Sequence, residues 1–267
     1  MNIFKQEFKM KTRSILIWSL SIAAFIIFYM AFFPGLSADS QALDSIMESL
    51  PKEMLQALGL REGLALSSLI GYFTLTFAMI QLAIAIQSSN YGFAILTEEE
   101  RELTADFLMS KPVSRNTIYW SKFLASFLSL LISSIVIGIA SFIALELFKS
   151  AESYSTVNVL KLMLTIPIFQ LMFLTLSMLI SLLFKKVRSV LSLSMALSIG
   201  FYVINSIRGI VGSDVLGYFT PFYYFEPGEI LKTGIIDLKL LLITLVIITV
   251  SLMASSYIYN SRDINSL

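Results

Sequence analysis

Six long apolar runs constrain the fold of this chain more than any other feature of its sequence. A helix needs about 20 residues to cross the hydrocarbon core of a bilayer, and only helices or closed barrels satisfy the backbone in lipid. The chain is 57% hydrophobic and only 14% charged, which is too apolar for an ordinary soluble domain. The sequence therefore predicts an all-α integral membrane protein, one domain over residues 1–267, with six transmembrane helices at about 14–33, 64–88, 117–147, 159–184, 189–207 and 238–259.

Several kinds of chemistry are excluded by residue types that the sequence lacks. The chain has no Cys and no His, which removes disulfides, thiol nucleophiles, zinc or haem ligands and His-based triads. It has no G-x-x-x-x-G-K-[ST] loop, so we expect no ATP binding and no cofactor in this chain. A membrane enzyme would need clustered carboxylates or Ser-Lys pairs at one membrane depth, and the spans show none. Among the carboxylates, Glu146 lies nearest to a span interior, and we predict that it forms an ion pair with Lys149 at the outer membrane edge.

Lys and Arg residues are distributed unevenly between the two sides of this predicted topology. If both termini lie inside, twelve of these residues fall on the inner side and seven on the outer side. The positive-inside rule then predicts that both termini are cytoplasmic. Residues 1–13 also have the pattern of a basic amphipathic helix that lies on an anionic leaflet, and a plain basic flank of the first span is the alternative. The net charge of +1 gives no basis for binding nucleic acid.

The segment 97–115 is a long charged stretch in a chain otherwise dominated by apolar runs. Thr97 and Glu100 have the spacing of a capping box, and acidic residues fill the first turn, where the helix dipole favours negative charge. Apolar residues then recur on one face, and Pro112 cannot continue the helix. We predict an amphipathic helix over residues 97–110, with a solvated loop as the alternative.

The same segment resembles the cytoplasmic coupling segment of permease subunits of ABC-2 exporters. The resemblance depends on an acidic cluster followed by Thr104-Ala105-Asp106-Phe107-Leu108 and Lys111-Pro112-Val113-Ser114-Arg115, although many members carry Gly where this chain has Leu103. It implies docking onto an ABC ATPase subunit that holds ATP and Mg²⁺, with two ATPase copies and a second permease copy as a homodimer or heterodimer. The coupling residues that it implies are Glu98, Glu99, Glu100, Arg101, Leu103, Thr104, Phe107, Leu108, Pro112 and Arg115.

Uncharged polar residues mark the second and fifth predicted spans. By the same resemblance, these two spans face the translocation path, which makes their polar residues candidates for its lining. The alternative is that they pack between helices and form interhelical hydrogen bonds. The residues are Gln81 in the second span and, at helical spacing in the fifth, Ser194, Ser198, Tyr202 and Asn205.

Two segments outside the spans are expected on the external side. Residues 37–63 are polar but contain two short amphipathic stretches, which we expect at the outer interface. Residues 209–237 are rich in aromatic side chains around Pro221 and Pro227, and they resemble the external re-entrant segment that precedes the last helix of ABC-2 permeases. The alternative for this segment is a surface aromatic belt without any role in gating.

These features predict a permease subunit of an ATP-driven ABC exporter in the bacterial plasma membrane, coupled to its ATPase through residues 97–115. A mostly apolar path suits amphipathic cargo such as a peptide, an antibiotic or a lipid-like molecule. Two alternatives remain open, a non-transporting membrane scaffold or receptor subunit and an ABC-2 permease that exports sodium.

Overall fold

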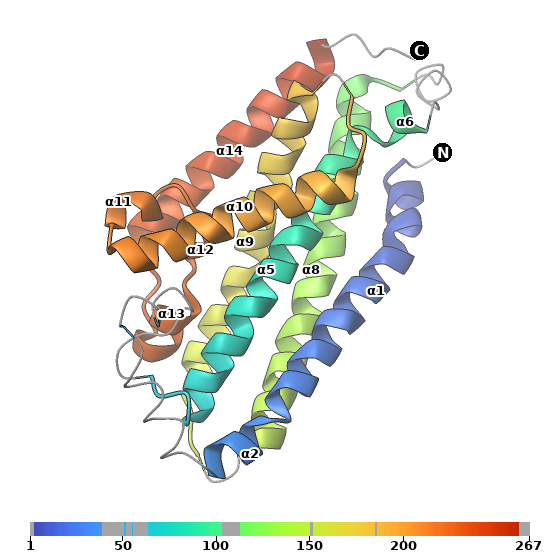
Figure 1. Ribbon diagram of the computed structural model, residues 1–267. Helices are drawn as coiled ribbons and strands as arrows, with labels where there is room; N and C mark the ends of the chain where they lie inside the picture. Colours follow the sequence, from blue (N-terminus) through green and yellow to red (C-terminus); the bar gives the residue numbers. More distant parts are fainter. Residues whose placement is uncertain are drawn as a thin grey trace.

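The computed structural model of the protein describes residues 3–38, 51, 55, 64–102, 113–149, 152–184 and 186–261. Within these ranges the regular structure is entirely helical, as predicted, and contains no strand. Figure 1 labels the helices along the chain as α1 (Ile3–Met30), α2 (Phe33–Ala38), α5 (Leu69–Ile95), α6 (Glu98–Arg101), α8 (Arg115–Phe148), α9 (Thr156–Leu183), α10 (Val190–Val211), α11 (Asp214–Gly217), α12 (Pro221–Tyr224), α13 (Pro227–Thr233) and α14 (Leu238–Ser261).

Six of the described helices are long and apolar enough to cross a bilayer, which confirms the predicted number of spans. They are α1, α5, α8, α9, α10 and α14, and the mean hydropathy of their most apolar windows ranges from 1.7 to 2.5. Their outward faces are apolar, with Leu20, Ile135 and Leu164 each about 60% exposed (62%, 61% and 61%). In water such faces would be unfavourable, whereas lipid accommodates them.

The long helices pack as a bundle around an aromatic centre. Figure 1 shows α1, α5, α8, α9 and α14 running roughly alongside one another, while α10 crosses in front of α5 and α9 at a steep angle. Helix α1 packs along α8, α5 lies between α9 and α10, and α14 contacts α9 and α8. Phe73, Phe77, Phe169 and Phe173 are at most 2% exposed and lie in the same hydrophobic core. The central position of α5 and α9 explains why both are largely buried.

Serine caps define where four of the spans begin. Ser68, Ser114, Ser155 and Ser189 each precede a long helix, and each side chain accepts a hydrogen bond from the backbone N–H three residues later. Each cap satisfies one of the backbone donors that a helix start leaves unpaired. At its other end α10 stops at Gly212, whose positive φ of 67° suits glycine and lets its N–H bond the Arg208 carbonyl.

The N-terminal residues differ from the expected interfacial helix. Residues 3–13 are the first turns of α1 and continue into the span without a break, because no Gly or Pro interrupts the helical sequence. Glu7 on this stretch is only 5% exposed, so one face of the basic region is packed against the protein. The structure thus corresponds to the alternative, a basic extension of the first span.

The aromatic segment before α14 folds back into the bundle as α11, α12 and α13. Phe222 and Phe225 are buried and both contact Phe169 edge to face, with ring centroids 5.4 and 6.1 Å apart. Of the aromatic residues between 218 and 225, only Tyr218 and Phe219 are exposed, so a surface belt describes these two alone. Helices α12 and α13 of this segment therefore belong to the core of the protein. Most of residues 37–63, for which two short helices were predicted, lie outside the described ranges.

Gly92 allows α5 and α9 to approach closely, and it supports a stability prediction. A Cβ atom at this position would overlap the Ser177 hydroxyl and the Leu174 carbonyl oxygen, whereas a Cβ at Gly200 would meet nothing within 4 Å. We expect Gly92→Ala to reduce the free energy of unfolding by about 1–3 kcal/mol through overpacking. The control Gly200→Ala should be neutral or stabilise by up to about 1 kcal/mol. Unfolding temperatures of both purified variants check this, and equal temperatures would contradict the packing.

Candidate functional site

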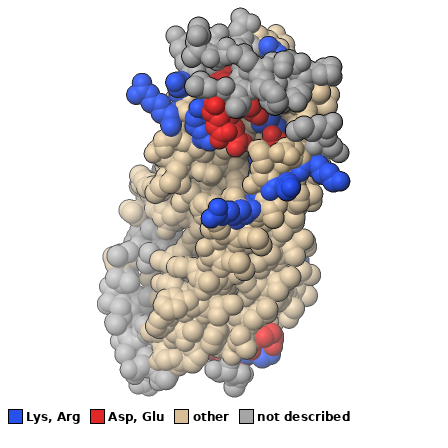
Figure 2. All heavy atoms as spheres, turned by 90° about the vertical axis from the view of Figure 1, so that its right-hand side faces the viewer, with Lys and Arg blue, Asp and Glu red and all other residues tan. Residues whose placement is uncertain are grey.

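The described parts of the predicted coupling segment, residues 97–102 and 113–115, lie at the end of the bundle where α1 begins and α14 ends (Figure 1). We call this the α6 end, because it also carries α6 between α5 and α8. Figure 2 shows that most charged side chains on the face beside α1 gather near this end, and that uncharged residues cover the broad surface below. The α6 end is therefore a charged region next to a broad surface of uncharged residues.

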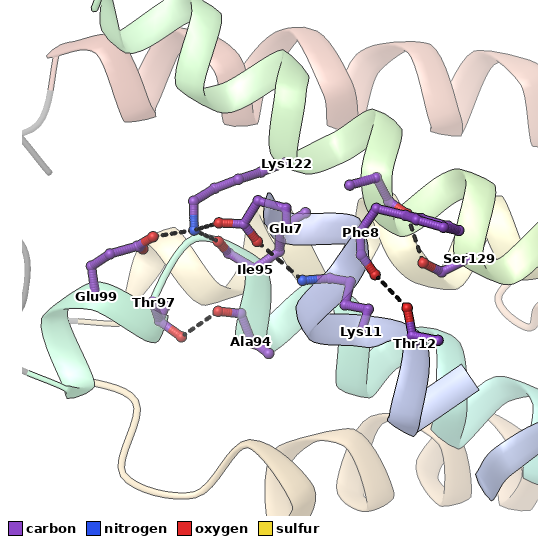
Figure 3. Close-up of polar contacts among 11 residues, drawn as sticks. Glu7, Phe8, Lys11, Thr12, Ala94, Ile95, Thr97, Glu99, Lys122 and Ser129 are labelled. Atoms are coloured by element: carbon purple, nitrogen blue, oxygen red, sulfur yellow. Dashed lines mark hydrogen bonds and ion pairs between the residues drawn. The ribbon is translucent and has the colours of Figure 1, made fainter. Parts of the chain in front are cut away.

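A fully buried lysine lies beneath the charged surface of the α6 end. Lys122 projects from the second turn of α8 and is 0% exposed. Its ammonium group donates to the Ile95 carbonyl at the end of α5 at 3.0 Å, and it pairs with Glu7 of α1 at 3.3 Å and with Glu99 of α6. Figure 3 shows the three acceptors converging on the Lys122 Nζ atom. One side chain thus joins four helices.

Glu7 completes a compact set of charges. Its carboxylate accepts an ion pair from Lys11, one turn along α1, at 3.3 Å, in addition to the pair with Lys122. The positive charges of Lys11 and Lys122 therefore neutralise the negative charges of Glu7 and Glu99. We refer to Glu7, Glu99 and Lys122 as the ionic junction. Removal of one partner from a buried pair typically costs about 3–5 kcal/mol, because it leaves the other charge uncompensated.

The predicted capping box at Thr97 does not form. The Thr97 side chain donates to the Phe93 carbonyl at 2.6 Å and makes no bond to the start of α6. Its backbone has φ −116° and ψ −4°, and its N–H bonds the Ala94 carbonyl. The last carbonyls of α5 lack helical partners and compete for the hydroxyl, which is already beside them. Thr97 therefore closes α5 and does not cap α6.

The structure places the other predicted coupling residues in three groups. Glu98 and Glu100 are half-buried on α6, while Arg101 is exposed, as is its neighbour Glu102, which was not among the predicted coupling residues. Arg115 starts α8, and its guanidinium lies 3.5 Å from the Asn260 carbonyl near the end of α14. The remaining five residues, and the rest of the predicted helix over 97–110, lie outside the described ranges: Leu103, Thr104, Phe107, Leu108 and Pro112.

Three of the five candidate translocation residues contact neighbouring elements of the same chain. Gln81 donates to the Phe225 carbonyl at 2.9 Å, the Ser198 hydroxyl lies 3.3 Å from that of Ser89 on α5, and Tyr202 packs edge to face on Phe222. Ser194 is buried and bonds its own helix, and Asn205 is half-buried. The opposite side of α10 is apolar and exposed at Leu191, Met195, Ile199, Val203 and Ile207. Within one chain these residues pack between elements, and their role in translocation stays a prediction.

Sequence analysis missed the role of Lys122 and Glu7. Lys122 is one of the twelve Lys and Arg residues on the inner side of the predicted topology. It stands among apolar residues seven positions into α8, where a charge requires a partner. Glu7 is the sole acidic residue among the first thirteen. These two anomalies were visible signals, but nothing in the sequence linked residues that are 115 positions apart.

Ion pairs also lie away from the α6 end, at the other end of α8 and in the last turn of α10. Lys149 pairs with Glu146 at 2.6 Å on the exposed end of α8, as predicted. Arg208 pairs with Glu226 at 3.4 Å and stacks 3.8 Å above the Tyr223 ring, beside a cavity of about 550 Å³. In the part of the chain that the structure describes, no three His, Cys, Asp or Glu side chains gather as metal ligands would.

Two adjacent carboxylates of α6 should respond differently to neutralisation. Glu99→Gln removes one partner of buried Lys122, so we expect the free energy of unfolding to fall by about 3 kcal/mol. This is the low end of the range for buried pairs, because Glu7 remains as a partner. Burial raises the pKa of the Glu98 carboxyl, an effect that Lys11 and Lys122 only partly offset. Glu98→Gln mimics the protonated form that the fold favours, so it should not destabilise the protein.

The pH dependence of stability provides the measurement. A carboxyl group whose pKa is raised in the folded state contributes stability at low pH, and this contribution is lost as the pH rises through the folded pKa. Glu98→Gln should therefore retain more of its low-pH stability at pH 8 than the parent does. Unfolding temperatures at pH 5 and pH 8 test both variants, and a larger loss for Glu98→Gln than for Glu99→Gln would refute the arrangement.

Comparison with known proteins agrees with this architecture. A family model described as ABC-2 family transporter protein matches residues 1–264 of the 267-residue chain. No curated protein matches the chain. Members of this family are multi-pass membrane permeases that normally partner with an ATPase subunit. With its six apolar spans and a match along almost its whole length, the chain belongs to the ABC-2 family of transporter proteins.

Proposed function

We propose that this chain is the membrane-spanning subunit of an ATP-driven exporter, and that residues 97–115 receive the movement of a separate ATPase subunit. The observation that carries the proposal is the attachment of α6 to three of the spans through the ionic junction. A segment fixed in this way can pass a displacement to the bundle, whereas a loosely tethered loop would absorb it. An ATPase can shift the permease between states only if it contacts those states differently, and α6 is a suitable contact.

The exposed charges of the α6 end support a docking role. Arg101 and Glu102 are exposed, and the beginning of α1 adds Lys5, Lys9 and Arg13 on its outer side. Both signs of charge are therefore available to a partner, while Glu99 is directed inward to Lys122. Such rim charges set orientation and association rate more than affinity. In this proposal the ATPase contacts Glu98, Glu100, Arg101 and Glu102, and Glu99 belongs to the inner side of the segment.

The proposed assembly has two permease copies and two ATPase copies in the bacterial plasma membrane. Two ATP sites form between paired ATPase subunits, and two-fold symmetry is the commonest closed arrangement. The positive-inside rule favours a cytoplasmic α6 end. The apolar faces and the scarcity of charges within the spans favour amphipathic cargo, with Gln81, Ser194, Ser198, Tyr202 and Asn205 proposed to border its path.

Sidedness is tested by cysteine labelling, which is direct because the natural chain has no Cys. Ile235 after α13 is 65% exposed, and Glu102 after α6 is also exposed. In intact cells we expect Ile235→Cys to react with a membrane-impermeant maleimide and Glu102→Cys to react only after permeabilisation. The reverse pattern would place α6 outside and end the coupling proposal.

ATPase docking is tested by exchanging the exposed charges with the double variant Arg101→Glu, Glu102→Lys. We expect normal insertion and an unchanged unfolding temperature, because both side chains are exposed. Retention of the tagged ATPase in a pull-down should fall about tenfold, equivalent to about 1.4 kcal/mol. The matched control exchanges the exposed pair at the opposite end, Glu146→Lys with Lys149→Glu, and should bind normally. Equal binding by both variants, or ATP hydrolysis by the permease alone, would contradict the proposed function.

A further inference from the structure

We infer that Lys122 is a positioning residue that makes α1, α6, α8 and the end of α5 move as one unit when the ATPase displaces residues 97–115. This inference extends the proposed function, on which it rests, by naming the residue that distributes the movement. It also gives the beginning of α1 a role in coupling, in addition to its role as a basic flank of the first span.

The contacts of Lys122 limit how the surrounding helices can move relative to one another. Its side chain is fully buried, so no water is available to replace a partner that moves away. Its three acceptors come from α1, the end of α5 and α6, and none lies on α8 itself. A shift of α6 alone would separate Glu99 from Lys122 and leave buried charge uncompensated. The arrangement that avoids this cost is a joint movement of the elements that meet at the Nζ atom, which Figure 3 shows together.

Helix α1 is suited to carry such a movement across the membrane. Its buried residues form one stripe along α8, and Glu7 is the first member of that stripe, followed by Ile15, Ser19, Ile22, Ile26 and Met30. Residues on the other side, such as Leu16, Leu20 and Phe28, are more than half exposed. A rigid contact along one side and a lipid-facing surface on the other allow α1 and α8 to shift as a pair. The ionic junction lies at the α6 end of that pair.

Stability alone does not require charges at this place. Apolar side chains of similar volume often replace a buried ion pair with little or no loss of stability. A charged junction differs in its response to separation, because displaced charges in a low-dielectric region lose much more than displaced methyl groups do. The junction therefore resists independent movement of its parts more strongly than an apolar contact of the same size would.

The test compares removal of one charge with removal of all three. Lys122→Met alone leaves Glu7 and Glu99 without their buried partner, so we expect poor folding. The triple variant Glu7→Gln, Glu99→Gln, Lys122→Met leaves no unmatched charge among the three, although Lys11 loses its pair with Glu7. Its unfolding temperature and ATPase pull-down should therefore return most of the way to the parent's values. We expect one property not to return, the change that the permease imposes on the hydrolysis rate of the ATPase. With the triple variant, the change in hydrolysis rate should fall to about one fifth of the parent's or below.

The outcomes separate the inference from the proposed function. If the triple variant regains the parent's effect on hydrolysis together with its stability, the junction is merely structural and the inference is wrong. If the parent itself neither binds the ATPase nor alters hydrolysis, the proposed function fails instead. The matched control is Glu146→Gln with Lys149→Met, which removes an exposed ion pair from the opposite end of α8 and should change none of the three measurements.

A second variant carries the test if the triple variant does not reach the membrane. Glu7→Gln detaches α1 from the junction but leaves Lys122 paired with Glu99 and bonded to the Ile95 carbonyl. We expect it to fold and to bind the ATPase, with a reduced effect on hydrolysis. A Glu7→Gln permease that alters hydrolysis as the parent does would overturn the role assigned to α1.

Discussion

An ammonium group withdrawn from water must be surrounded by compensating charge, and the α6 end of this protein is arranged around that requirement. The effective penalty for burying an ion is several kcal/mol, which Lys122 recovers only by facing Glu7, Glu99 and the Ile95 carbonyl together. The packing of α1 against α8 and the turn from α5 into α6 both follow this constraint. Neighbouring tyrosines add further links, since Tyr91 bonds Ser14 of α1 and Tyr119 bonds Ser255 of α14.

The middle of the bundle obeys the same rule with uncharged groups. Gln87 and Ser133 join α5 to α8, and Ser134 donates to Gln170 at 2.5 Å to join α8 to α9. Many other buried hydroxyls, such as Ser129 and Ser177, bond a carbonyl of their own helix. Interhelical bonds of this kind contribute about 0.6–2 kcal/mol each in membranes. Hydrogen bonds between polar side chains therefore connect the helices inside the protein, while apolar side chains cover its outer surface.

Helix α5 connects the two regions that matter most for the proposed mechanism. Its last residue, Ile95, accepts the Lys122 hydrogen bond, and Gln81 in its middle holds the Phe225 carbonyl of the aromatic segment. That segment is in turn tied to α10, at its last turn by the pair between Arg208 and Glu226 and at its middle by the bond from Thr220 to the Phe201 carbonyl. A displacement at the α6 end thus has a continuous, hydrogen-bonded route to the opposite half of the subunit.

Local requirements allowed much of this architecture to be predicted from the sequence alone. The thickness of a bilayer and the need to pair every backbone group act on each apolar run separately, so the sequence alone predicted the number and approximate limits of the spans and the place of the charged segment between two of them. The ion pair of Glu146 and Lys149 could also be predicted, because the two residues are three positions apart on one helix.

Tertiary structure decided which distant residues meet and which of two possible partners each polar group takes. The hydroxyl of Thr97 had two helices within reach and bonded α5, and the polar side of α10 turned toward α5 and α12 because α10 crosses the bundle. Glu7 and Lys122 come together through the packing of α1 on α8, and the turn from α5 into α6 brings Glu99 to them. Periodicity specifies the face of a helix on which a charge lies, but the free energy of burying that charge depends on the partners that the fold brings to it.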